Sequence, residues 1–583
     1  MDNDLLEPLK FYETRGRELH NENAQNYFDE LLAKSGVNVE ENRATVKAYK
    51  AEMHRIDKLN KKIRKYKTLR VLTVIGVIAA VIAAIAGVYY LVTAGGWKPI
   101  VALCVGLVFA VIGIILCKKK LTPTIKHATE VREKHERRAE ELLGQAQEQT
   151  APLNALFDDT DTLKLIEKTV PDFSFDRRFT KDHEALFVKQ HDFWDLSRQT
   201  TSMTDTLSGR FAGNPFLFCR RRVHEMSTKT YFGTLLITWT EHYRDSKGNM
   251  RTRMRSQTLH ASVIKPYPIF YTNSYLCYGS QAAPDLSFSR APQHSEDLTE
   301  KQREKKIRKG EKKLQKKAEK ALETGGSFQE MANSEFDVLF GAFDRDNEVQ
   351  FRLMYTPLAQ QNTVDLMTSE TGYGDDFHFT KRKRCNIITS EHAQSWNMNT
   401  SAANYYSYDV DEIKTKFIQF NAAYFKSVFF DFAPLLSVPA YAEEPCVALE
   451  EIEDYESNYT YYEHEVMANA IGCSSFAHPQ SDTEAILKTS VVHKGADEDK
   501  VDVTAFSFNA VERVDFIPVR GGDGKMHAVP VPWLEYIPVE RTVPMAVALA
   551  EYSEKERRDI RNSGKNTLPE GIFFHGMVAR PLE

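Results

Sequence analysis

The sequence predicts an α+β protein in which an N-terminal transmembrane helical hairpin with helical extensions precedes a β-rich and an α+β cytosolic region. Two uncharged runs lie near the N-terminus, helical periodicity flanks both, and alternating β-branched segments begin beyond residue 165. The net charge of −5 is nearly balanced, and an aromatic content of 11% is typical of folded chain. These properties argue against a nucleic-acid-binding protein and against a disordered one.

The changes in pattern divide the chain into ranges that we interpret as domains and linkers. They are 1–60 (N-terminal cytosolic helices), 61–120 (transmembrane hairpin), 121–165 (cytosolic helix), 166–295 (β-rich domain), 296–326 (basic helix linker) and 327–583 (α+β domain).

Residues 71–92 and 100–117 are the two predicted membrane spans. The first run holds about 22 uncharged residues, and at about 1.5 Å per residue a helix of that length covers the ~30 Å hydrocarbon core. Between the runs, two glycines and Pro99 interrupt the helix, and Trp97 suits the headgroup level. The pair therefore predicts a hairpin inserted in the lipid bilayer.

The flanks of the spans predict their orientation. Six basic residues lie within 61–70 and three within 118–120, whereas the connecting turn carries only Lys98. The positive-inside rule then places both termini in the cytoplasm of a cell whose membrane holds the chain. Seven cysteines without a CxxC pair suit that reducing compartment.

Small residues at four-residue spacing, Gly76, Ala80 and Ala84, give the first span a face that helices can approach closely. We expect this face to pack on the second span, with self-association of several chains as the alternative. The spans hold no charged residue, which argues against an ion or substrate path.

The segments on either side of the hairpin are predicted to be helices. Before it, apolar residues fall on alternating three- and four-residue steps and predict a short coiled-coil seam. The seam residues are Val46, Tyr49, Met53, Ile56 and Ile63. After it, His135 and Arg138 stand where a seam needs apolar residues. Pairing of the two helices, pairing with a neighbouring chain and a solvated second helix all stay open.

Residues 229–268 predict two β-strands around a turn at 245–249. In the second strand Arg251, Arg253 and Arg255 alternate with uncharged residues and should share one face. Such a face could hold phosphate or a membrane surface, although a solvated strand face is the commoner case.

A run of eleven lysines and arginines from Lys301 to Lys320 predicts an inserted basic helix. Near an anionic leaflet such residues contribute about 1 kcal/mol each. The candidates for contact with anionic lipid headgroups are Lys305, Arg308, Lys309, Lys312, Lys313 and Lys316. Glu304 lies four residues before Arg308, which is typical of an ordinary solvated helix, and that interpretation comes before membrane contact. RNA binding is disfavoured because the run has no interleaved aromatic residues.

The segment 336–367 predicts a strand, an acidic turn, a second strand and a short helix that opens at Pro357. Its opening "FDV" at Phe336 and the run "YTPLAQQ" from Tyr355, with two spans near the N-terminus, resemble an uncharacterised family of bacterial two-span membrane proteins with a cytosolic α+β core. The resemblance implies this topology and no catalytic activity.

Three short motifs look like active-site signatures and fail on their context. "YGDD" at 373–376 resembles the Mg²⁺-binding turn of RNA polymerases, but it lacks the preceding apolar strand and is interpreted as an acidic turn. "DRDNE" at 344–348 lacks the glycine and the glutamate of a calcium loop. "RGGDGKMH" at 520–527 lies between strand-like runs and predicts a hairpin turn.

One cluster has metal-ligand residue types: Glu463, His464, Cys473 and His478. No second histidine follows His464 at the spacing of a zinc protease, so we interpret these residues as structural and predict no metal or cofactor.

The segment 411–444 carries the apolar stripe Phe417, Phe420, Tyr424 and Val428, while Lys426, Asp431 and two prolines argue against a third span. A buried core helix is expected, with an interfacial helix that contacts lipid as the alternative.

Together these patterns predict a membrane-anchored cytosolic binding or scaffolding protein whose ligand the sequence does not identify. The alternatives are a membrane-tethered enzyme with an unrecognised site and a self-associating membrane assembly of several copies. No catalytic motif was found, and the partner expected from sequence is the bilayer itself.

Overall fold

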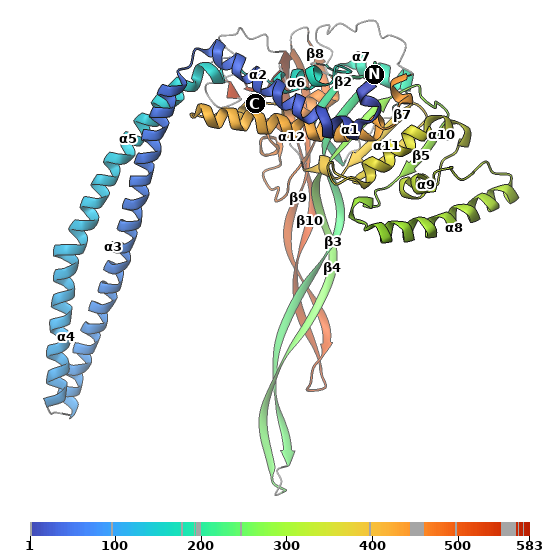
Figure 1. Cartoon of the computed structure of the whole chain (residues 1–583). Coiled ribbons are helices and arrows are strands. Elements are labelled where there is room, and N and C mark those ends of the chain that lie inside the picture. Colours follow the sequence, from blue (N-terminus) through green and yellow to red (C-terminus); the bar gives the residue numbers. More distant parts are fainter. Residues whose placement is uncertain are drawn as a thin grey trace. The chain divides into compact units, whose positions relative to one another are not determined.

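The computed structural model describes most of the chain (Figure 1). The described residues are 3–94, 97–176, 179–191, 193, 200–244, 248–395, 398–443, 460–495, 498–549, 567–568, 571–574 and 577–582.

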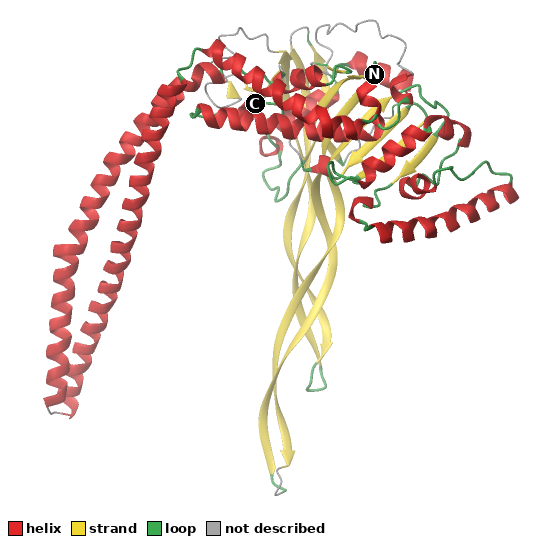
Figure 2. Ribbon diagram, in the orientation of Figure 1, coloured by secondary structure: helices red, strands yellow, loops and turns green. Residues whose placement is uncertain are grey.

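The chain forms two compact units. Unit 1 comprises Met1–Asn26, Asp158–Ala403 and Ile418–Glu583, and unit 2 comprises Tyr27–Phe157 and Asn404–Phe417. Unit 2 is helical, and unit 1 combines helices with two antiparallel sheets (Figure 2). The predicted α+β class is therefore confirmed.

Three long helices dominate unit 2: α3 (Val39–Ala94), α4 (Trp97–Leu116) and α5 (Thr122–Asn154). A π-helical turn, Cys117–Leu121, joins α4 to α5 without a break in the helical path. The first predicted span is the C-terminal part of α3, because no glycine or proline separates it from the polar residues that precede it.

Among the described residues, one helix is long and apolar enough to cross a membrane, Val39–Ala86, and its apolar window is almost entirely exposed. The second predicted span is helical as α4, but many of its side chains lie outside the described ones. A membrane-spanning length is thus present once in the described residues, and the two-span hairpin stays a prediction.

Small residues bring α3 and α4 together. Ala84 and Ala110 are buried, and a Cβ on Gly113 would overlap the side chain of Val77. Gly76 lies on the exposed side of α3, so only part of the predicted small-residue face makes this contact. The expectation that this face packs within one chain is therefore right for Ala84 and wrong for Gly76.

The polar parts of α3 and α5 also lie against one another. His135 Nδ1 lies 2.6 Å from Glu52 Oε2, and Gln149 Nε2 donates to Thr45 Oγ1 over 3.2 Å. Val46, Ile56 and Ile63 of the predicted seam are buried, whereas Met53 is 44% exposed. The two extensions therefore pack within one chain, and polar pairs replace apolar residues where the seam is interrupted.

Unit 1 contains a seven-stranded antiparallel sheet in the order β1-β2-β3-β4-β7-β6-β5. Strands from the predicted β-rich and α+β ranges join in it. Its strands are β1 (Phe173–Phe175), β2 (Thr201–Phe211), β3 (Asn214–Arg244), β4 (Met250–Gly279), β5 (Ser287–Arg290), β6 (Phe377–Arg382) and β7 (Cys385–Ser390).

A second antiparallel sheet has the order β11-β12-β13-β10-β9-β8. Its strands are β8 (Ile486–Lys494), β9 (Glu498–Arg520), β10 (Met526–Leu549), β11 (Thr567–Leu568), β12 (Gly571–Phe574) and β13 (Met577–Pro581).

Strands β3 and β4 pair without a register shift from Phe216 and Tyr278 to Arg244 and Met250. Strands β9 and β10 form a second long hairpin, and the two run side by side beyond the sheets (Figure 1). Both hairpins were predicted. The turn at 521–525 is confirmed, and most of the predicted turn at 245–249 lies outside the described residues.

Apolar residues hold the two hairpins face to face. Ile237, Leu259 and Val529 form a buried cluster, and a Cβ on Gly233 would overlap the backbone of Pro530. Close approach of two backbones therefore requires glycine at position 233.

The segment 336–367 differs from its prediction, because its two expected strands are helices. Helix α9 (Ser334–Phe340) is capped by Asn333, and α10 (Glu348–Met354) by Asn347. The two asparagine caps decide the outcome, since each side chain accepts a backbone N–H at the first turn. The helix expected at Pro357 is correct and is α11 (Pro357–Thr368).

Helix α12 (Val410–Leu436) is a core helix, as expected. In unit 1 its residues Phe425, Phe429 and Phe432 are almost fully buried within the large apolar core beneath the seven-stranded sheet. The alternative of an interfacial helix is wrong, because the aromatic side chains contact protein. The other α-helices are α1 (Pro8–Phe11), α2 (Arg17–Ser35), α6 (Asp161–Thr169), α7 (Lys181–His191), α8 (Glu300–Thr324), α13 (Ala440–Glu443), α14 (Tyr461–Ile471) and α15 (Cys473–Phe476).

Candidate functional site

Helix α8 is the predicted basic helix, and its ends explain its limits. Thr299 and Gln302 form a capping box at its start, and Gly325 adopts a left-handed conformation at its end. One face is held against unit 1, because Leu314 is buried and a Cβ on Gly310 would overlap Val338. The side of the helix that packs on the protein and the side that faces solvent are therefore both fixed.

The solvent-facing side of α8 carries all six predicted lipid-contact residues. Their spacing of three and four places them in one stripe, and every one is exposed. Within the described part of the chain, Arg308 is the one member with an ion pair, to Glu304 at 3.7 Å. We call Lys305, Arg308, Lys309, Lys312, Lys313 and Lys316 the basic stripe.

The two lysines on the inner side are held differently. Lys306 Nζ donates to the Gln293 carbonyl over 3.3 Å, and Lys317 Nζ donates to the Phe343 carbonyl. Burial is the largest cause that lowers the pKa of Lys306. Neither lysine is among the six predicted contact residues, so helical spacing separates both from the exposed set, but it does not show their internal partners.

The arginines near the tip of the β3–β4 hairpin share one face, as predicted. Arg253 and Arg255 each donate from Nε to Glu241 Oε2, over 2.5 and 2.6 Å, and Arg253 lies over the ring of Tyr243. These contacts partly neutralise the predicted basic face.

The "YGDD" turn is buried rather than solvent-facing. Asp375 pairs with buried Arg290 and accepts hydrogen bonds from Ser295 Oγ and the Gln293 N–H, both at 3.0 Å. Its carboxylate is therefore occupied in joining β5 and the segment between β5 and α8 to the core. The acidic character was predicted, but its burial and its internal partners were not.

Asp376 pairs with His392, which sequence reasoning missed. His392 Nδ1 lies 2.7 Å from Asp376 and Nε2 lies 3.3 Å from Asp431, while the imidazole stacks on Tyr373 at 3.8 Å. Burial alone would lower the pKa of His392, but Asp431 and Asp376 outweigh it and raise the pKa. The arrangement favours a buried imidazolium between two carboxylates, which is a structural pairing.

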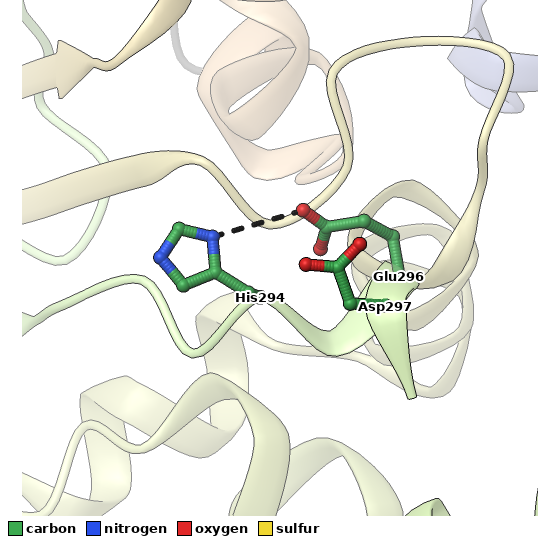
Figure 3. Close-up of side chains that lie close together, drawn as sticks. All are labelled: His294, Glu296 and Asp297. Atoms are coloured by element: carbon green, nitrogen blue, oxygen red, sulfur yellow. Dashed lines mark ion pairs between the residues drawn. The ribbon is translucent and has the colours of Figure 1, made fainter. Parts of the chain in front are cut away.

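A second group that sequence reasoning missed is His294, Glu296 and Asp297 (Figure 3). One ligand atom from each side chain lies within 4.8 Å of the others, and His294 Nδ1 is 3.8 Å from Glu296 Oε1. Glu296 already accepts the Asp375 N–H over 2.9 Å, and the charge of Lys306 acts on it. The positive charge of Lys306 would oppose a divalent cation at this group.

The predicted cluster around α14 is dispersed. Glu463 accepts the backbone N–H of Thr460, and His464 Nε2 lies 3.4 Å from Asp499. Cys473 contacts Arg222 instead, and His478 accepts the Gln480 N–H. Burial lowers the pKa of His464 to about 4. The interpretation of these residues as structural agrees with this geometry.

An open groove of about 570 Å³ lies between the bases of the two long hairpins. Tyr267 and Tyr536 meet edge to face across it at 5.4 Å, and Asp482, Glu484 and Glu512 give it an acidic character. Glu484 is paired with Arg222 at 3.1 Å, and Asp482 accepts the Ala510 N–H. Most of its polar groups are thus occupied within the chain.

Searches of protein-family models, curated proteins and solved structures found no match to this chain.

Proposed function

We propose that this chain is a membrane-anchored binding or scaffolding protein, held in a cell membrane by the α3–α4 hairpin with both termini cytoplasmic. The observation that carries the proposal is the uncovered apolar surface of α3, where Leu72, Ile75, Ile78, Ile82 and Ile85 are 54–65% exposed. Exposure of this surface to water is unfavourable, because transfer of each such side chain from water to an apolar phase contributes about 1.5–3 kcal/mol of free energy.

Alkaline extraction of membranes that contain the full chain tests the anchor. The wild-type chain should stay in the pellet. Replacing Ile78 and Ile82 by lysine should release it, because each charge at mid-bilayer costs about 2.5–3.5 kcal/mol. The matched control places lysines at Val349 and Leu353, which are 68% and 70% exposed on α10, and should stay in the pellet. A wild-type chain found in the supernatant rejects the anchor.

We further propose that the basic stripe of α8 binds anionic lipid headgroups. Six cations on one exposed face, with one ion pair among them, support this role. Burial of Leu314 fixes the helix so that the stripe faces away from the protein. At about 1 kcal/mol for each engaged residue, two or three contacts suffice for a stable orientation.

Amine labelling of the full chain in lipid discs tests this contact. Lys305, Lys309, Lys312, Lys313 and Lys316 should react more slowly in discs rich in anionic lipid than in neutral discs, and the difference should shrink at high salt. Lys525, in the β9–β10 turn, is the internal control and should react equally in both. Equal labelling of the stripe in the two kinds of disc at low salt rejects the contact.

A further inference from the structure

The β3–β4 hairpin has two faces of opposite chemistry beyond the sheet. Because its register is regular, even-numbered residues of both strands share one face and odd-numbered residues share the other. The odd face contacts the β9–β10 hairpin through Ile237 and Leu259. We call the even-numbered residues from 226 to 242 and from 252 to 266 the outer face.

The outer face is fully exposed and carries no Asp, Glu, Lys or Arg, although 27% of the whole chain is charged. Its residues are Met226, Thr228, Thr230, Phe232, Thr234, Leu236, Thr238, Thr240, His242, Thr252, Met254, Ser256, Thr258, His260, Ser262, Ile264 and Pro266. Every charged residue of these two stretches, such as Lys229, Glu241 and Lys265, lies on the odd face.

Large apolar side chains project from this uncharged face. Phe232, Leu236, Met254 and Ile264 are exposed by 73%, 66%, 79% and 68%. A long exposed ribbon normally carries charges that prevent association, and lysine is the commonest. Lack of charge together with exposed apolar groups is the pattern of a surface that another chain covers.

A second copy of this chain fits the outer face better than a charged partner. In a two-fold contact the same surface meets itself, so a charge near the axis would lie close to its own copy, and a neutral face avoids that repulsion. Threonine hydroxyls can donate and accept, so they also pair with themselves across the axis. The opposite face of the same hairpin already packs on another hairpin around Ile237 and Val529, which shows that such a ribbon can be covered by a second one.

The dimensions of the outer face are suitable for a dimer. Sixteen residues of strand span about 50 Å, and two strands are about 10 Å wide, so the flat footprint is roughly 500 Å². Side-chain relief increases the accessible area above this value, toward the ~800 Å² that each partner buries in a standard interface. Anchoring in one membrane would raise the local concentration of the two copies.

We propose that the outer face of the β3–β4 hairpin binds the outer face of a second copy and forms a two-fold dimer. Only the concentration argument rests on the membrane anchor proposed above. The contact would leave the tip arginines and the acidic groove accessible, because both belong to other surfaces of unit 1.

Site-directed crosslinking of the full chain in membranes tests the dimer. In a background with Cys104, Cys117, Cys446 and Cys473 replaced by alanine, single cysteines are placed at Thr230, Thr234 or Thr238, and a bis-maleimide is added. At least one outer-face cysteine should give a crosslinked dimer. Arg253→Cys, on the odd face of the same hairpin, is the matched control and should give none.

A charge on the outer face should abolish the product. Leu236→Lys, combined with the reactive cysteine, should eliminate crosslinked dimer, whereas Leu353→Lys on α10 should leave its yield unchanged. Lys265 pairs with Asp515 across the two hairpins, so slow amine labelling of Lys265, as in the wild-type chain, shows that the variant is folded. Outer-face cysteines that give no dimer, that crosslink to a different protein, or that crosslink regardless of Leu236→Lys overturn the proposal. If the chain crosslinks but is extracted from membranes at alkaline pH, the membrane anchor is rejected and the dimer is not.

Discussion

Two buried histidines in unit 1 have opposite electrostatic surroundings. His392 lies between Asp376 and Asp431, and its pKa is raised because their charges outweigh its burial. His20 lies between Thr169 and the Asn421 carbonyl, and burial lowers its pKa to about 4. Neither position is apparent from sequence, because the partners of each histidine are far from it along the chain.

Replacing His392 by glutamine should destabilise the chain most at low pH. The pKa of His392 in the folded chain lies above its value of about 6.5 in the unfolded chain. The histidine therefore adds stability that is fully present below pH 6.5 and is lost as the pH rises through the folded-state pKa. Breaking a buried charge pair costs about 3–5 kcal/mol. The thermal unfolding midpoint in detergent should therefore fall much more at pH 5.5 than at pH 9.

His20→Gln is the control with the opposite sign. Because the folded pKa of His20 lies below the unfolded one, the wild-type chain loses this contribution as pH falls below about 6.5. The substitution should therefore cost more at pH 8 than at pH 5. Parallel pH dependence of the two variants would contradict the assignment of His392 as an imidazolium.

At the scale of elements, hairpins and apolar helices could be predicted from the sequence, and short helices could not. The alternation of residues 229–268 has period two over a long stretch, so strand type and register follow from it. The two apolar runs within residues 336–354 are too short for their period to decide between strand and helix. Asn333 and Asn347 were the available signal, since asparagine before an apolar run marks a helix start.

Some of the candidate sites could be predicted from the sequence and others could not. The basic stripe follows from helical spacing alone, and all six residues lie where that spacing places them. The His392 group depends on contacts with a distant turn and with α12, which no local pattern encodes. The His294 group lies within four residues of sequence, so its residue types were visible there, but the contact of Glu296 with Asp375 was not. The outer face is an intermediate case, because its lack of charge is visible in the sequence only once the register is known.

The packing of the two hairpins should depend on Gly233. In Gly233→Ala the added Cβ meets the backbone of Pro530, which cannot move as a flexible side chain can. Overpacking of this kind costs about 1–3 kcal/mol. The expected result is faster amine labelling of Lys265, which is paired with Asp515 at 2.7 Å and lies 4.1 Å from the ring of Trp533.

Thr234→Ala is the matched control, because residue 234 is next in sequence but lies on the exposed face. It should leave the labelling of Lys265 unchanged. If Lys265 in the Gly233→Ala variant is labelled at the wild-type rate, the backbone contact between the two hairpins does not limit their separation.

At the scale of the whole molecule, the charges that flank the predicted spans determine on which side of a membrane the rest of the chain is expected to lie. Nine basic residues flank the predicted spans on the polar side, against Lys98 in the turn. Moving the large region after residue 117 to the opposite side would require those nine charges to follow it across the bilayer. The positive-inside rule therefore predicts that this region stays in the cytoplasm.

Protease added to intact cells should consequently leave the chain after Cys117 uncut, and permeabilised cells should lose it rapidly. The long hairpins provide sensitive targets, because Arg251 and Arg253 lie on exposed strand near the tip of β3–β4. A variant with Lys118, Lys119 and Lys120 changed to glutamine and three lysines added beside Lys98 reverses the charge bias. If topology follows charge, part of that population should become cleavable from outside. Cleavage of the wild-type hairpins in intact cells would instead place the outer face, the basic stripe and the groove outside the cell, and the proposed contact with a cytoplasmic anionic leaflet would then be impossible.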